Sequence, residues 1–286
     1  MTFLPKALCL DMDGTLLNNH NQLTENTLTI IQYIRQQGVR VFIVTGRSLN
    51  EVFDSAPADI ELDGFVTANG MITYLDGEKL LEHSLSTTLV EKVIQSAREH
   101  NIYYEAHPND GDRLSLLEDK PYMEKMISGN KPDQVGINEW LEREDAINHD
   151  IKWYEQLPEQ KYAKMYCFSS EQTEMKNWIE CLEELKKETD FTTSSSSHHN
   201  VEVMVSGVNK ATGIKALLNH YGISPEQTMA MGDSNNDIPM MKYVGYPVGM
   251  RNATDQIKEL VTDTTTYTND EEGVYHFLKN YFQAEV

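Results

Sequence analysis

Short apolar runs of strand length alternate with helical segments at both ends of this chain. Residues 6–11 form the first apolar run, and the segment 23–37 carries apolar residues near helical spacing before Gly38, a common helix stop. The run VRVFIVT at 39–45 follows and is rich in β-branched residues, which favour strands. A strand, a helix and a second strand at these lengths predict a βαβ unit with parallel strands.

The alternation continues and then resumes near the C-terminus. Ser48 and Glu51 have the spacing of a capping box, which predicts a helix start, and DGFVTANG at 63–70 predicts a third strand. Towards the C-terminus we expect short strands at 228–233 and 245–250, and helices at 210–223, 236–244, 254–261 and 270–281. The predicted fold class is α/β, with a doubly wound, mostly parallel, Rossmann-like core.

The middle of the chain has a different order of elements. Residues 84–205 read as helix, strand, strand and helix, followed by a strand at 161–170, a helix at 171–188 and strands at 191–197 and 200–205. This order predicts an α+β domain (84–205) inserted into a core formed by residues 1–83 and 206–286.

Charge and composition exclude several classes of protein. The 286 residues carry a formal net charge of −21, which argues against a nucleic-acid or anionic-membrane surface. No apolar run reaches about 18 residues, so we expect no membrane span, and the N-terminus lacks the pattern of a signal peptide. Three widely spaced cysteines predict a reducing, cytoplasmic location. The oligomeric state is left open.

Two carboxylates, Asp11 and Asp13, come directly after the first strand, with Gly14 next to them. Ligands of doubly wound sheets bind beyond the carboxyl ends of the strands, which is where these acids fall. Acidic residues at such places also act as ordinary helix caps, so this pair alone leaves both interpretations open.

Three further segments lie at equivalent positions. Thr45, Gly46 and Arg47 end the second strand, where a hydroxyl and free N–H groups can bind an anion. Lys210 opens a predicted helix. A polar turn after the strand at 228–233 supplies Asp233, Asn236 and Asp237. Together these segments offer carboxylates for a hard cation and donors for a phosphate, which predicts Mg²⁺ and a phosphate ester as ligands.

These motifs resemble the haloacid dehalogenase (HAD) superfamily of phosphohydrolases, in its Cof-type, sugar-phosphatase-like branch (subclass IIB). The resemblance rests on DMDGTL (11–16), VTGR (44–47), TANG (67–70), GVNKATGIKAL (207–217), MGDSNNDIPMM (231–241), VGMRNA (248–253) and DEEGVYHFL (270–278). It covers both core segments and implies an HAD-like core with an inserted cap domain. One departure is Gly249-Met250-Arg251, where the family usually has Ala-Met-Gly.

The resemblance also implies a role for each site residue. Asp11 would be the nucleophile that forms an aspartyl-phosphate, and Asp13 the general acid and then the general base. Mg²⁺ would be held by the side chains of Asp11 and Asp233 and by the backbone carbonyl of Asp13, with Asp237 as a supporting residue. The implied phosphate ligands are the Met12 N–H, Thr45, Gly46, Lys210 and Asn236. Arg47 and Asn69 are candidate supporting or substrate-proximal residues.

Two alternatives to a Mg²⁺-dependent phosphatase for small phosphate monoesters remain. A phosphomutase of the same superfamily would return the phosphoryl group to a second sugar position. A non-catalytic phosphate-ligand binding protein would need neither Asp11 nor Asp13. Residues 84–205 are expected to select the substrate, which the sequence does not name. The roles of His198, His199 and Arg251 are open, although adjacent strand residues such as this His pair would point to opposite faces.

Overall fold

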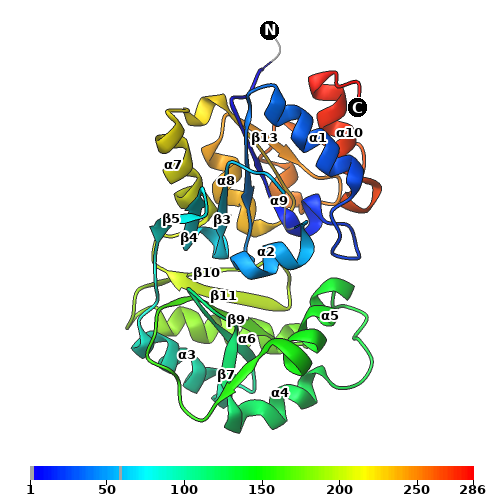
Figure 1. The fold of residues 1–286 in the computed structure, drawn as a ribbon. Helices are drawn as coiled ribbons and strands as arrows, with labels where there is room; N and C mark the ends of the chain where they lie inside the picture. The colour runs from blue at the N-terminus through cyan, green and yellow to red at the C-terminus, as the bar shows by residue number, and fades with distance from the viewer. Residues whose placement is uncertain (1–2, 58–59) are drawn as a thin grey trace. The chain divides into compact units, whose positions relative to one another are not determined.

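The computed structural model describes residues 3–57 and 60–286, which form two compact units. The first unit combines the chain up to Glu82 with the chain from Val208 onward, and the second unit is His83–Gly207 (Figure 1). The second unit is therefore an insertion into the first.

The first unit is built on an eight-stranded sheet with the strand order β14-β13-β12-β1-β2-β3-β4-β5. Its strands are β1 (Ala7–Leu10), β2 (Arg40–Val44), β3 (Gly64–Thr67), β4 (Ile72–Leu75), β5 (Glu78–Glu82), β12 (Thr228–Gly232), β13 (Tyr246–Gly249) and β14 (Asp263–Thr264). The strands from β14 to β3 pair in parallel. Strands β4 and β5 add an antiparallel hairpin, which the sequence analysis did not predict although its Asp76-Gly77 turn is typical of hairpins.

Helices cover both faces of this sheet. They are α1 (Glu25–Gln36), α2 (Leu49–Ser55), α7 (Lys210–Tyr221), α8 (Ile238–Tyr243), α9 (Asp255–Lys258) and α10 (Gly273–Phe282). Helix α1 packs against α10 on one side, and α7 packs against α8 on the other (Figure 1). All four residues of β1 are buried, as expected for a central parallel strand with helices on both faces. The α/β prediction with a mostly parallel sheet is confirmed.

The strand order reverses at β1, and this reversal fixes the location of the site. Strand β2 pairs with one edge of β1, whereas β12 pairs with the other edge. The connections that leave the two central strands therefore diverge, and ligands of doubly wound sheets bind at the carboxyl ends of strands at such a point. Asp11 follows β1 and Asp233 follows β12, so both acids lie at this switch point.

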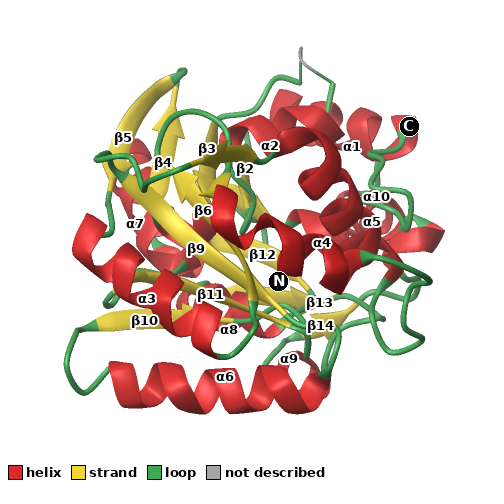
Figure 2. Cartoon of the chain, turned by 90° about the horizontal axis from the view of Figure 1, so that it is seen from below, coloured by secondary structure: helices red, strands yellow, loops and turns green. Residues whose placement is uncertain are grey.

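The second unit has its own six-stranded sheet, in the order β10-β11-β9-β6-β7-β8. Its elements are α3 (Thr87–Glu99), β6 (Tyr103–Pro108), β7 (Leu114–Leu116), α4 (Lys120–Ile127), α5 (Ile137–Asp145), β8 (Lys152–Tyr154), β9 (Tyr162–Phe168), α6 (Gln172–Leu185), β10 (Phe191–Ser194) and β11 (Asn200–Val205). Helices α3 and α6 pack on one face of this sheet (Figure 2).

Several sequence-based expectations about individual elements were wrong. The second unit contains a helix, α5, and a strand, β8, that were not predicted; β8 has three residues, too few to show a periodicity. The helix expected at 254–261 spans only Asp255–Lys258, because the chain turns away to bond to β13, where the Thr262 N–H donates to the Pro247 carbonyl.

No helix within residues 3–57 and 60–286 has the length and apolar character that crossing a lipid bilayer requires.

Candidate active site

The loop after β1 places Asp11 against the turn that follows β12. Asp11 is 4% exposed, and its backbone N–H donates to the carbonyl of Met231 in β12. Gly14 has a φ of +73°, and a Cβ atom at this position would lie 2.3 Å from Oδ2 of Asp233. Only glycine therefore lets the loop approach the Asp233 carboxylate this closely.

Lys210 joins two of the acids in the interior. It is the first residue of α7 and is completely buried, and its Nζ lies 2.6 Å from Oδ1 of Asp11 and 2.6 Å from Oδ1 of Asp237. Burial alone would lower the pKa of Lys210, but the two carboxylates raise it above its usual value. This lysine is therefore a fixed positive charge.

Three carboxylates converge around this ammonium. One oxygen each of Asp11, Asp233 and Asp237 lies within 4.8 Å of the others. Burial and then the charge of Asp237 raise the pKa of Asp11 well above its usual range, with Lys210 acting in the opposite direction. Burial and Asp237 also raise the pKa of Asp233 to about 7. With all three carboxylates ionised the cluster would carry more negative charge than Lys210 balances, and the raised pKa values of Asp11 and Asp233 reflect this crowding as well as burial.

A divalent cation fits this set of donors. Carboxylate oxygens are the ligands that hard cations such as Mg²⁺ prefer, and a cation would relieve the repulsion that, together with burial, raises the two pKa values. Asp237 is already engaged by the protein, since its Oδ2 accepts the N–H groups of Asp233 and Ser234 at 3.0 Å. Its Oδ1 contacts Lys210, so backbone and ammonium donors engage both of its oxygens. The donors to Asp233 are hydroxyl groups, which can rotate away, so Asp11 and Asp233 are the candidate ligands for a cation.

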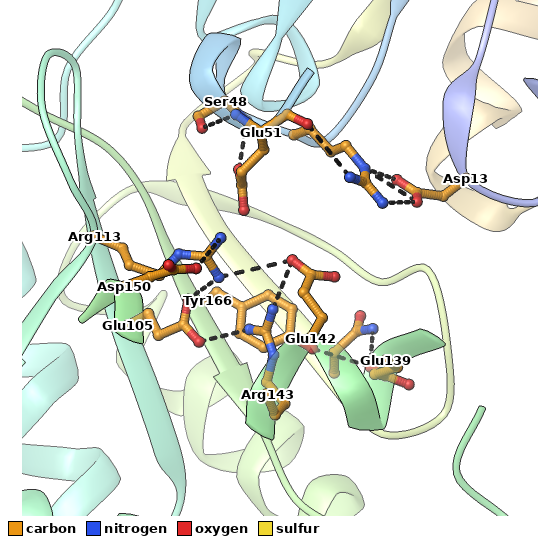
Figure 3. A network of polar contacts seen from close by, with 12 residues as sticks. Asp13, Ser48, Glu51, Glu105, Arg113, Glu139, Glu142, Arg143, Asp150 and Tyr166 are labelled. Atoms are coloured by element: carbon orange, nitrogen blue, oxygen red, sulfur yellow. Dashed lines mark hydrogen bonds and ion pairs between the residues drawn. The ribbon is translucent and has the colours of Figure 1, made fainter. Parts of the chain in front are cut away.

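The loop after β2 carries the residues that the sequence predicts to bind an anion. Thr45 is completely buried, and its hydroxyl oxygen accepts the N–H of Arg47 at 3.1 Å, so the hydroxyl hydrogen can point to an anion. The predicted capping box is confirmed: the Ser48 N–H donates to Glu51, and the Glu51 N–H donates to the Ser48 hydroxyl (Figure 3). Gly46 lies between Thr45 and Arg47 in this loop.

Arg47 binds the second carboxylate of the first motif. Its Nη2 lies 2.6 Å from Oδ1 of Asp13, and Figure 3 shows the Asp13 carboxylate within this contact. Desolvation alone would raise the pKa of Asp13, but the Arg47 guanidinium has the larger effect and lowers it. In this arrangement Asp13 is ionised and is not poised to donate a proton.

The remaining predicted phosphate ligands lie around the same carboxyl ends. Met12 is buried directly after Asp11. Asn236 lies in the turn after β12, and its Nδ2 donates to Oδ1 of Asn69, a buried residue in the turn after β3, at 3.3 Å. The two asparagines, 167 positions apart in the sequence, are thus linked directly.

Of the three residues whose roles were open, Arg251 and His199 have partners outside the carboxylate cluster. Arg251 is 59% exposed and forms an ion pair with Glu271. His199 is buried in the second unit and its Nδ1 contacts the carbonyl oxygen of Ser169. His198 is exposed. The pair lies in a bend before β11, not on a strand as the sequence analysis assumed.

Sequence reasoning missed three residues that support the site. The Thr15 hydroxyl and the Ser234 hydroxyl both donate to the carboxylate of Asp233. The Asn252 amide donates to the carbonyl of Gly14 at 2.8 Å. Thr15 and Ser234 are neighbours of motif acids, which could have suggested them. Asn252 lies 238 positions from Gly14, and only the fold reveals that contact.

The second unit contains a separate buried ion cluster around Glu105 (Figure 3). Its carboxylate is completely buried and lies 2.7 Å from Arg143 and 3.1 Å from Arg113. Burial would raise the pKa of Glu105, but the two guanidinium groups lower it far below its usual range. The strand pairing puts Glu105, Tyr166 and Glu202 side by side, so one face of this sheet is polar.

The fold and the carboxylate cluster define an α/β protein with an acidic, lysine-bridged site at the switch point of its sheet. The chain belongs to the family of haloacid dehalogenase-like hydrolases, whose family model matches residues 8–278. The resemblance inferred from the motifs is thereby confirmed, and the relatives described next are named as phosphatases.

Two similar relatives come from Bacillus subtilis (strain 168), and both are named 5-amino-6-(5-phospho-D-ribitylamino)uracil phosphatase. YcsE is 30% identical over 278 residues, which cover 96% of this chain and 95% of the relative. YwtE is 28% identical over 284 residues, which cover 96% of each chain.

Solved structures share the fold. A haloacid dehalogenase-like hydrolase from B. subtilis superimposes with a TM-score of 0.80 at 23% identity, over 96% of this chain and 99% of that one. The HAD subclass IIB sugar phosphatase BT4131 superimposes with a TM-score of 0.73 at 20% identity, over 98% of this chain and 100% of that one.

Proposed function

We propose that this chain is a Mg²⁺-dependent phosphatase that hydrolyses small phosphate monoesters through an aspartyl-phosphate on Asp11. The observation that carries the proposal is the environment of Asp11. Its carboxylate is buried beside the ammonium of Lys210 and lies in one cluster with Asp233. A nucleophilic carboxylate next to fixed positive charge is what attack on an anionic phosphate ester requires.

The metal would be held by the side chains of Asp11 and Asp233 and by the backbone carbonyl of Asp13. When bound, Mg²⁺ would supply positive charge that stabilises the phosphate oxygens during transfer. Lys210 contributes charge from the protein side, and its contacts with Asp11 and Asp237 hold it in place. We propose that the Thr45 hydroxyl, the N–H groups of Met12 and Gly46 and the Asn236 amide bind the phosphate oxygens.

The proposed reaction has two steps that both use Asp13. In the first, a carboxylate oxygen of Asp11 bonds to phosphorus while the bond from phosphorus to the ester oxygen breaks, and Asp13 gives its proton to that oxygen. In the second, Asp13 takes a proton from water, whose oxygen attacks phosphorus and releases inorganic phosphate from Asp11. Because Arg47 holds Asp13 ionised, this pair has to separate before the first step.

The substrate is proposed to be a sugar phosphate or a similar metabolite in the cytoplasm. The names of YcsE and YwtE make a phosphorylated ribityl compound a first candidate for this chain. We propose that residues 84–205 select among such esters.

The test is phosphate release from p-nitrophenyl phosphate, followed by a screen of phosphate esters ranked by kcat/KM. We expect turnover with Mg²⁺, none with EDTA, and a loss of at least about a thousandfold in Asp11→Asn. Asp54→Asn, an exposed acid on α2, is the matched control and is expected to keep wild-type activity. A protein that binds phosphate but shows no metal-dependent turnover, with Asp11→Asn unchanged, would contradict the proposal.

A further inference from the structure

The turn between β3 and β4 holds three consecutive residues in the left-handed region of the backbone. The φ angles are +46° at Ala68, +53° at Asn69 and +99° at Gly70. Alanine resists this region and asparagine tolerates it better than most residues. Such strain persists only where the surrounding structure imposes it, and it is found most often at functional sites.

Backbone hydrogen bonds fix this turn to the loop after β2. The N–H of Ala68 donates to the carbonyl of Arg47 at 2.8 Å, and the N–H of Asn69 donates to the carbonyl of Thr45 at 2.9 Å. The turn is therefore tied to the segment that carries the proposed anion site.

The same turn contacts the start of α7. A Cβ atom on Gly70 would lie 2.1 Å from the carbonyl oxygen of Asn209, the residue that precedes Lys210. The absence of a side chain at Gly70 thus lets the turn lie directly against the peptide that leads into the buried lysine.

The side chain of Asn69 makes a third link, to the turn after β12. Asn69 is 1% exposed, and its Oδ1 accepts one N–H of the Asn236 amide. Oδ1 of Asn236 is buried and has no hydrogen-bond partner among the described residues. The amide of Asn236 is therefore held through its nitrogen, and the second N–H on that nitrogen remains to donate to an anion.

We propose that Asn69 is a positioning residue that orients the Asn236 amide toward the phosphate, an inference that rests on the phosphatase function proposed above. The backbone of the turn explains why asparagine stands at this position, and the contact with Asn236 explains what its side chain does. Asn69 itself need not touch the substrate.

The test is a double-mutant cycle of Asn69→Gly and Asn236→Ala, because glycine keeps the left-handed backbone and removes the side chain that carries the acceptor. Measurements are kcat/KM for the best ester and the dissociation constant of inorganic phosphate. We expect Asn69→Gly to lower kcat/KM about tenfold, with little change in Tm. In the Asn236→Ala background, Asn69→Gly should change kcat/KM by less than about twofold, because the two residues act as one unit. Independent, multiplying effects would overturn the proposal.

Asn101→Gly is the matched control, since Asn101 is an exposed asparagine with a φ of +52° in the second unit. It is expected to leave kcat/KM unchanged.

A crystal structure of Asn69→Gly adds a readout that does not depend on turnover: we expect the Asn236 amide to rotate or to lose its order. An unmoved amide would overturn the role of Asn69 even if the protein proves to be a phosphatase. A protein without turnover in which the amide moves would refute the phosphatase function alone.

Discussion

Arg47 and Asp13 form a two-pronged ion pair, with Nη2 at 2.6 Å from Oδ1 and Nε at 2.9 Å from Oδ2. The pair joins the loop after β2 to the loop after β1. It also holds the proposed general acid in the charge state that cannot protonate a leaving group.

Replacing Arg47 with Met should therefore change the pH dependence of the reaction. Because Arg47 lowers the pKa of Asp13, its removal raises that pKa, and a larger fraction of Asp13 is protonated near neutral pH. For an alkyl phosphate, whose leaving group needs a proton, the basic limb of the kcat/KM profile should move to higher pH. For p-nitrophenyl phosphate, whose leaving group does not, we expect little movement of that limb.

The difference between the two substrates is the control for a general loss of activity. A basic limb that stays in place for the alkyl ester, or that moves equally for both esters, would show that Arg47 does not set the protonation of Asp13.

Mg²⁺ should stabilise the folded protein through Asp233. Metal bound only by the folded state adds about 2.7 kcal/mol to the free energy of unfolding at a concentration of 100 times Kd. We expect MgCl₂ to raise Tm relative to EDTA in the wild type, and Asp233→Asn to abolish most of that rise. In EDTA the same variant should be at least as stable as the wild type, because one of the three crowded carboxylates becomes neutral. An equal Mg²⁺ response in variant and wild type would exclude Asp233 as a ligand.

Lys210→Met should destabilise the protein as well as abolish turnover. Removing one partner of a buried ion pair leaves uncompensated charge, which costs about 3–5 kcal/mol. The free energy of unfolding, measured with urea in EDTA, should fall by this amount, and adding Asp237→Asn should recover part of the loss. Lys215→Met, at an exposed position of the same helix, is the control and should change stability by less than about 0.5 kcal/mol. Equal losses at both lysines would contradict the ion-pair explanation.

Asp63 should contribute stability that is lost at acid pH. Burial would raise its pKa, but the Val41 N–H and the guanidinium groups of Arg35 and Arg40 lower it. The pKa of Asp63 is therefore lower in the folded protein than in the unfolded chain, where it is about 3.9. Ionised Asp63 stabilises the fold at pH values above the pKa of the unfolded chain. This stabilisation disappears as the pH falls through the lower pKa of the folded protein.

The measurement is the free energy of unfolding of Asp63→Asn and wild type across pH. At pH 7 we expect the variant to be less stable by about 2 kcal/mol, and the gap should close below about pH 4. A gap that does not depend on pH would mean that the ionised form of Asp63 is not what matters.

Much of the core could be predicted because its signals are local. The β-branched run before Thr45 and the Ser48–Glu51 capping box are readable within a few residues, and the structure has both. The hairpin of β4 and β5, the helix α5 and the short β8 were missed. Their existence depends on pairing and packing with distant segments, which local propensity does not encode.

The sequence by itself determined which residue types stand at the ends of the strands: Asp11 after β1, Thr45 after β2 and Asp233 after β12. It could not determine their distances or charge states, because these depend on which strands become neighbours. Only the tertiary structure brings Lys210 to within 2.6 Å of Asp11, 199 positions away, and links Asn236 to Asn69. Likewise, the motif places Asp13 beside Asp11, but only the packed loops give it Arg47 as a partner. Coulomb energy depends on separation in space and on burial, and neither is a property of the sequence alone.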